Sequence, residues 1–279
     1  MLSVREDRIL ARLVLSEPSI GSPTLNLFVK NDFKKNVTDR KIRNYMIRRG
    51  LSAHRNVKKQ LLTQKMRQKR LQWAEEPLKK PDEFWRSILF SDESYINIFC
   101  GQSTHARRPI IHWRNSISSK YFSQAPKHPI SVMIWGCFSY FGVGRIKVVS
   151  GTMKSNNYID VLKEKMLPSA NDIFKGGPYI FQDDSAPCHR SKTVREWHKI
   201  NGVQTLEWPG NSSDLNPIDN LWGILKQRIR AKKLKSRSEL ISAIVRVWHH
   251  EIDVQLCQNL IASMKSRLQV VIKNSGGHT

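Results

Sequence analysis

The sequence predicts an α/β fold class, with a mixed central sheet flanked by helices and a small all-α domain in front of it. Three observations support this prediction. Capped amphipathic helices fill the first fifty residues, strand-like segments begin after Trp85, and strands and helices then alternate irregularly. Strands followed by mixed strands and helices indicate one sheet covered by helices. We expect domains at residues 1–52 and 85–279, joined by a basic linker at 53–84 that contains a short helix at about 63–76.

Charge is distributed unevenly along the 279 residues, whose formal net charge is +24 and whose pI is near 10.2. Residues 1–80 hold 20 Lys and Arg against 7 Asp and Glu, and residues 220–279 hold 11 against 3. The middle of the chain, residues 81–219, holds 16 against 13. Basic flanks around a nearly neutral middle indicate a protein that binds polyanions. The alternative is a basic surface that only maintains solubility, or a ribosome-like tail.

Cysteine usage and hydropathy favour a soluble intracellular protein with no membrane segment. The four cysteines form no C-x-x-C pair, so they are expected as small core residues in a reducing compartment. No apolar run approaches the roughly 18 residues that span a bilayer, and no signal-peptide core is present. Basic clusters at 58–70 and 226–235 fit nuclear import and a DNA-facing surface equally, and we expect the nucleus.

The first fifty residues predict a helix-turn-helix domain. Ser3 and Glu6 have the spacing of a capping box on a first helix, and Gly21 begins a break before a second. Thr38 caps a third helix that stops at Gly50. Such a last helix can lie in the major groove and donate to phosphates and guanine edges. The alternative is a small helical bundle without DNA contacts. The expected DNA-binding residues, all on the outward face of the third helix, are Arg40, Lys41, Arg43, Asn44 and Arg48.

The second domain shows strand patterns first and helical patterns later. Strands are expected at 87–90, 94–99, 130–138, 144–151 and 178–182, and helices at 156–169, at 191–199 and from Pro217 onward. Asn216 caps the last of these helices and Pro217 occupies its first position.

Three acidic residues lie where apolar segments meet a turn or a helix start. Asp92 follows the strand at 87–90, Asp184 follows the strand at 178–182, and Asp219 lies in the first turn of a helix. Carboxylate oxygens are the ligands that Mg²⁺ and Mn²⁺ prefer, and two such ions about 3.5–4 Å apart can cleave a phosphodiester. The alternative is structural, because an Asp after a strand is usually a turn residue and an Asp in a first helical turn complements the macrodipole.

Three longer segments resemble a known family. SDES (91–94), YIFQDDSAPCH (179–189) and SSDLNPIDNLWGILKQRIR (212–230) resemble the catalytic signatures of the mariner superfamily of cut-and-paste DNA transposases, especially its Tc-like branch. The resemblance continues in the same order through WGCFSYFGVG (135–144), SGTMKSNNYIDVL (150–162) and SMKSRLQVVIKNSGGHT (263–279).

The resemblance implies an RNase H-like core whose catalytic and metal-binding triad is Asp92, Asp184 and Asp219. It implies two Mg²⁺ or Mn²⁺ ions, cleavage at the element's ends, and transfer of the 3′-hydroxyl into TA sites of target DNA. The implied partners are the double-stranded terminal inverted repeats, target DNA and a second copy of the chain on paired ends. Asp183 stands where the family usually has Gln, and is therefore expected as a neighbour and not a ligand.

Several positions depart from the family pattern. Asp219 stands where the Tc-like branch usually has Glu and mariner relatives have Asp. Ser185 replaces a usual Asn, and Ser213 replaces a usual Pro. The family resemblance also implies two N-terminal helix-turn-helix modules, of which we expect only the second in this chain. The alternative function is therefore a degenerate or co-opted transposase-derived protein that binds DNA without transposing it.

Overall fold

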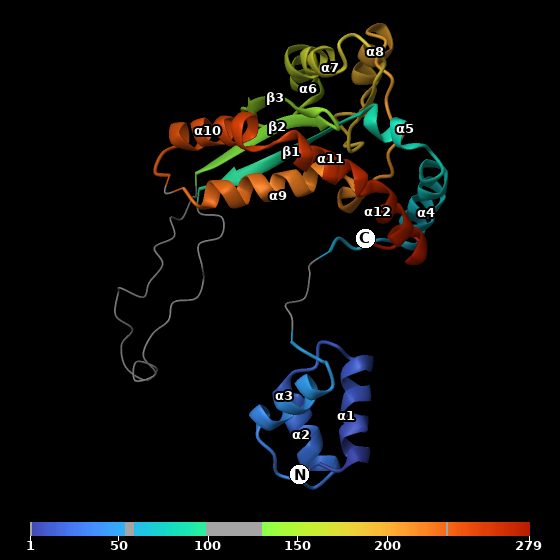
Figure 1. Cartoon of the computed structure of the whole chain (residues 1–279), viewed down its shortest axis with the longest axis vertical. Helices are drawn as coiled ribbons and strands as arrows, with labels where there is room; N and C mark the ends of the chain where they lie inside the picture. Colours follow the sequence, from blue (N-terminus) through green and yellow to red (C-terminus); the bar gives the residue numbers. More distant parts are fainter. Residues whose placement is uncertain (1, 54–58, 99–129, 233) are drawn as a thin grey trace. The chain divides into compact units, whose positions relative to one another are not determined.

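The computed structural model describes residues 2–53, 59–98, 130–232 and 234–279 (Figure 1). These residues form two compact units, Met1–Gln60 and Leu61–Thr279. None of the helices in the described ranges is both long and apolar enough to cross a membrane. Cys137, Cys188 and Cys257 are free thiols, and Cys100 lies outside the described residues.

The first unit is a three-helix domain, as predicted. Its helices are α1 (Val4–Ser16), α2 (Ser22–Asp32) and α3 (Asp39–Arg48). Ser3 and Glu6 form the predicted capping box on α1, and the Thr38 side chain accepts a hydrogen bond from the Lys41 amide at the start of α3. Apolar side chains from all three helices meet in one small core, made of Leu10, Leu25, Val29, Ile42 and Met46.

The second unit combines four strands with helices on both sides (Figure 1). Its elements are α4 (Gln64–Leu78), α5 (Asp82–Arg86), β1 (Ile88–Asn97), β2 (Ser131–Ser139), β3 (Gly142–Val149), α6 (Ser155–Val161), α7 (Leu167–Phe174), β4 (Ile180–Gln182), α8 (Lys192–Ile200), α9 (Pro217–Arg230), α10 (Arg237–Arg246), α11 (Val254–Ala262) and α12 (Met264–Lys273). A π-helical turn joins α6 to α7, and another follows α10.

The sheet is mixed, as predicted, with the strand order β3-β2-β1-β4. Strands β1 and β2 and strands β2 and β3 are antiparallel, whereas β4 is parallel to β1. The prediction of separate strands at 87–90 and 94–99 was wrong for the part that the structure describes, because β1 continues from Ile88 to Asn97. Pairing with β2 keeps the polar Ser-Asp-Glu-Ser segment extended, so Asp92 lies within the strand, opposite Gly136.

Two apolar layers cover the two faces of this sheet. Neighbouring residues in a strand point to opposite faces, so Phe90 joins the layer under α9 to α12, while Leu89 joins the layer under α6 to α8. Figure 1 shows α9, α10 and α11 on one side of the sheet and α6, α7 and α8 on the other. The helices thus enclose the central strands, from which the candidate site is built.

Residues 61–84, expected as part of a basic linker with a short helix at about 63–76, contain α4 and α5 and pack with the second unit. The Arg70 side chain of α4 is fully buried. Its guanidinium forms a two-pronged ion pair with Asp214, with both nitrogen–oxygen distances 2.8 Å, and also donates to the Gly276 and Gly277 carbonyls. The helix is therefore attached to the core by buried charge and not only by apolar contacts.

Candidate active site

Asp92 projects from β1 toward helix α9, where an indole holds it. Trp222 donates a hydrogen bond from Nε1 to Asp92 Oδ2 at 3.0 Å. The residue paired with Asp92 is Gly136, where a Cβ atom would stand only 2.8 Å from the Trp222 ring. The glycine therefore provides the space that lets this indole reach the carboxylate.

Asp219 lies in the first turn of α9, as predicted. Asn216 caps that helix by accepting from the Ile218 amide, and Pro217 is its first residue. Trp222 follows Asp219 by three residues, so the same helix carries one acid and the indole that holds another. Burial raises the pKa of Asp219 to about 6. The positive charge of Lys226 lowers this pKa, and the negative charge of Asp184 raises it.

Asp184 lies two residues after β4 in a tight turn. Its Oδ1 accepts a hydrogen bond from the Ala186 amide at 2.9 Å and lies 2.9 Å from His189 Nδ1. Burial alone would raise the pKa of Asp184, but His189 and the Ala186 amide outweigh it and lower the pKa. Ser185 has a φ of +63°, in the left-handed region that Asn tolerates better than most residues. The positive φ of this turn thus explains why Asn would suit position 185.

His189 connects Asp184 to a fourth carboxylate that sequence reasoning missed. The imidazole is buried and stacks on Tyr158 with ring centroids 3.9 Å apart. Its Nε2 atom lies 3.4 Å from Glu93 Oε1. Neither nitrogen has hydrogen-bond geometry, so both contacts are ion pairs. Burial lowers the pKa of His189, but Asp184, Cys188 and Glu93 outweigh it and raise the pKa to about 12.

The three predicted acids are electrostatic neighbours. Burial raises the pKa of Asp92 well above its usual range, and the charges of Asp219, Glu93 and Asp184 raise it further. Across the described ranges, however, no three Asp, Glu, His or Cys side chains are gathered closely enough to hold a metal ion. Carboxylates that oppose one another's ionisation form a site whose charge a divalent cation would neutralise. The donor chemistry therefore fits Mg²⁺ or Mn²⁺.

Asp183, expected as a neighbour of the triad, turns its carboxylate into the local backbone. Its Oδ1 accepts a hydrogen bond from the Ser185 amide at 3.0 Å. Burial raises the pKa of Asp183, with the charge of His189 opposing the shift. The side chain is thus occupied by the turn that presents Asp184.

The helix-turn-helix unit presents its predicted DNA-binding residues to solvent. All five, Arg40, Lys41, Arg43, Asn44 and Arg48, are exposed on α3. The opposite face of the helix buries Ile42 and Met46.

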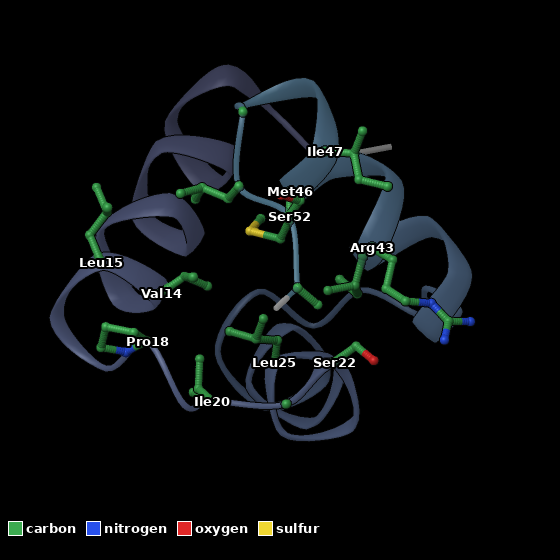
Figure 2. Close-up of a pocket in the computed structure, with 15 residues that line it drawn as sticks. Val14, Leu15, Pro18, Ile20, Ser22, Leu25, Arg43, Met46, Ile47 and Ser52 are labelled. Atoms are coloured by element: carbon green, nitrogen blue, oxygen red, sulfur yellow. The ribbon is translucent and has the colours of Figure 1, made fainter. Parts of the chain in front are cut away.

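Beside α3 lies an apolar cavity of about 440 Å³ (Figure 2). Figure 2 shows Leu25 and Met46 around it, with the Arg43 guanidinium extending away. The cations therefore gather on the exposed face of α3.

The chain matches two transposase family models. A model described as "DDE superfamily endonuclease" matches residues 87–241, and a second, described as "Transposase", matches residues 7–79. The chain is 33% identical over 276 residues to the Tcb1 transposase of Caenorhabditis briggsae, which covers 97% of this chain and 98% of that protein. The chain belongs to the Tc1/mariner family of DDE-type transposases. It is also 29% identical over 273 residues to the Tc1 transposase of Caenorhabditis elegans, again covering 97% of this chain and 98% of the relative.

Solved transposase structures share the fold of this family member. The Mos1 transposase paired-end complex with left transposon end matches with a TM-score of 0.81 at 16% identity, over 100% of this chain and 81% of that one. The catalytic domain of Mos1 mariner transposase matches with a TM-score of 0.61 at 17% identity, over 80% of this chain and 100% of that one. The predicted RNase H-like core behind a helix-turn-helix domain is thereby confirmed as the fold. The expectation that this chain has only the second of the family's two helix-turn-helix modules stays a prediction.

Proposed function

We propose that this transposase cuts its element out of DNA and joins it to a new site, with Asp92, Asp184 and Asp219 as the catalytic and metal-binding residues. The observation that carries the proposal is that Asp92 is hydrogen-bonded to Trp222 of α9, the helix that also carries Asp219, while the charges of Asp219 and Asp184 both reach Asp92 and raise its pKa. Asp92 comes from the sheet, Asp184 from the turn after β4, and Asp219 from the start of α9. They would hold two Mg²⁺ or Mn²⁺ ions.

The reaction requires each carboxylate to be ionised and correctly oriented. The divalent ions that Asp92, Asp184 and Asp219 would hold would supply activation of water or a 3′-hydroxyl and stabilisation of the leaving oxygen. Trp222 orients Asp92 through its 3.0 Å hydrogen bond, and His189 holds Asp184 at 2.9 Å. An in-line displacement depends on such orientation, since a misplacement of about 1 Å can cost about 10²-fold in rate.

DNA recognition is proposed for the first unit. Arg40, Lys41, Arg43, Asn44 and Arg48 would contact the major groove and phosphates of the terminal inverted repeats. The similar Mos1 transposase structure is a paired-end complex with left transposon end, which supports a homodimer of this chain on paired ends. Insertion at TA sites and residence in the nucleus complete the proposal.

The second candidate is a transposase-derived DNA-binding protein that no longer transposes DNA. Asp219 favours it, because Asp is one methylene shorter than the Glu that the Tc-like pattern has there. If the shorter reach is the defect, Asp219→Glu will restore cleavage. If Asp219 is a competent ligand, wild-type protein will already cleave.

The test is strand cleavage of a labelled duplex that carries the element's own terminal repeat, with Mg²⁺ or Mn²⁺. We expect the wild type to cleave and Asp184→Ala to be inactive. Asp160→Ala, on the exposed face of α6, is the matched control and is expected to cleave normally. Equal cleavage by wild type and Asp184→Ala would remove the triad assignment.

A further inference from the structure

A second cavity lies next to the proposed active site, within the second unit. It has a volume of about 530 Å³ and is bounded by α4, α8, the loop at 205–210 and the turn after β4. Asp183 and Ser185, the residues on either side of Asp184, both line it. Any ligand in this cavity would therefore lie within a few residues of a carboxylate proposed to act on the scissile phosphodiester.

Two helices present matched pairs of side chains to this cavity. Lys69 and Trp73 are four residues apart on α4, and Arg195 and His198 are three apart on α8, so each pair shares one helical face. Trp73 is held in place because its Nε1 donates to the Glu207 carbonyl at 2.6 Å and its ring packs against Trp208, with centroids 4.9 Å apart. The cavity thus has one fixed aromatic wall.

The polar groups around the cavity are only partly used by the protein. Arg190 donates to the Trp208 carbonyl at 3.1 Å. The side chains of Lys69 and Arg195, by contrast, form no hydrogen bond or ion pair with any residue the structure describes. His198 is 7% exposed, and neither of its ring nitrogens has a hydrogen-bond partner within the described ranges. A buried polar group without a partner is destabilising, so this ring is suited to a ligand that supplies a hydrogen bond.

We propose that this cavity holds one nucleotide of the DNA strand that is cut, adjacent to the scissile phosphodiester, with its phosphate on Arg195 and Lys69 and its base against Trp73. The proposal rests on the proposed function. Cations beside an aromatic ring are the usual combination for holding single-stranded nucleotides. The volume lies within the range of about 300–1,000 Å³ typical of small-molecule sites.

The acids around the cavity restrict where each part of the nucleotide lies. Asp183 and Glu207 also line it, so a phosphate is favoured only on the side of the three cations Lys69, Arg190 and Arg195. The acids and His198 are instead suited to the donors and acceptors of a base edge. A nucleotide at a strand break lacks a stacking neighbour on one side, so its base leaves the duplex at low cost.

The test uses the full chain with EDTA present, so that binding is measured without cleavage. The probe is a DNA duplex with a single-stranded thymidine overhang in which one base is 5-iodouracil, which cross-links to nearby aromatic side chains on irradiation. We expect an adduct on the α4 peptide that contains Trp73, and its loss in Trp73→Leu. Arg195→Glu should weaken the adduct about tenfold, the effect of losing one charge-assisted contact.

The matched control is Lys199→Glu, which makes the same charge change on an exposed residue of α8 that does not line the cavity. It should leave the α4 adduct within about twofold of wild type, since only general attraction is altered. Equal losses in Arg195→Glu and Lys199→Glu, or adducts elsewhere and none on α4, would overturn the nucleotide site. If the protein cleaves DNA in the separate metal-dependent assay but forms no adduct here, the nucleotide site is refuted and the proposed function is not. If it forms the adduct but does not cleave in that assay, the proposed function is refuted and the nucleotide site is not.

Discussion

Gly136→Ala should damage the proposed active site without replacing any of the three proposed catalytic residues. A Cβ at this position would lie 2.8 Å from Trp222 Cη2 and 3.1 Å from Trp248 Cζ2. Carbon atoms pack best at about 3.5–4.0 Å, so the indoles would have to move by several tenths of an ångström. Both rings are buried and stacked on each other with centroids 5.0 Å apart, which leaves them little room. Overpacking of this kind costs about 1–3 kcal/mol of folding free energy.

The same movement would take Trp222 Nε1 out of its hydrogen bond with Asp92. Because a displacement of about 1 Å can cost about 10²-fold in rate, we expect cleavage to fall by one to two orders of magnitude. Urea unfolding measures the stability loss, and cleavage of the labelled duplex measures the rate. The control is Gly223→Ala, in α9, where an added Cβ meets nothing within 4 Å. If Gly136→Ala has the wild-type free energy of unfolding and the wild-type cleavage rate, the glycine does not position Asp92 through Trp222.

Three further substitutions test other parts of the structure. Arg70→Met removes a fully buried guanidinium from Asp214, whose own side chain is 15% exposed, and should cost about 3–5 kcal/mol in urea unfolding. Arg145→Met, which breaks an exposed pair with Asp172, should cost under about 1 kcal/mol. Similar costs in the two variants would contradict a stabilising role for the buried guanidinium. Burial lowers the pKa of His198 from 6.5 to about 4, so the stability from its neutral form is complete above pH 6.5 and is lost as the pH falls toward 4. His198→Gln should remove on the order of 3 kcal/mol of that dependence, and an unchanged pH profile would refute the assignment. Ser185→Asn should raise the free energy of unfolding by about 0.5 kcal/mol, because Asn fits the +63° φ better; a loss of stability would show that the 3.2 Å bond from Ser185 Oγ to the Trp208 carbonyl matters more.

The features that sequence analysis predicted correctly depend on residues close together in the chain. The capping box of Ser3 and Glu6, the Thr38 cap and the Asn216-Pro217 helix start each involve residues within three positions of one another. Hydrogen bonds over such short separations follow from local sequence. The position of Asp219 in a first helical turn could therefore be predicted before any tertiary contact was known.

The features that it did not predict depend on distant partners. Strand β1 stays extended through Asp92 because β2 pairs with it from about forty positions away, and no local pattern signals that pairing. Arg70 was expected in a basic linker, yet its side chain is buried against Asp214, which is 144 positions away. The contact between His189 and Glu93 likewise joins two segments that the chain separates widely. In each case the decisive interaction is tertiary and the local composition indicates a solvated residue.

The signature segments are best understood as interlocking parts, since each supplies an acid or the residue that holds an acid from another segment. The segment 212–230 supplies Asp219 and also Trp222, which holds Asp92 of segment 91–94. The segment 91–94 in turn supplies Glu93, which contacts His189, and His189 holds Asp184 within 179–189. Gly136 belongs to a segment without an acid, yet it makes room for Trp222. A substitution in any one segment is therefore expected to misplace a carboxylate from another, and pairs of such substitutions should show non-additive losses of cleavage.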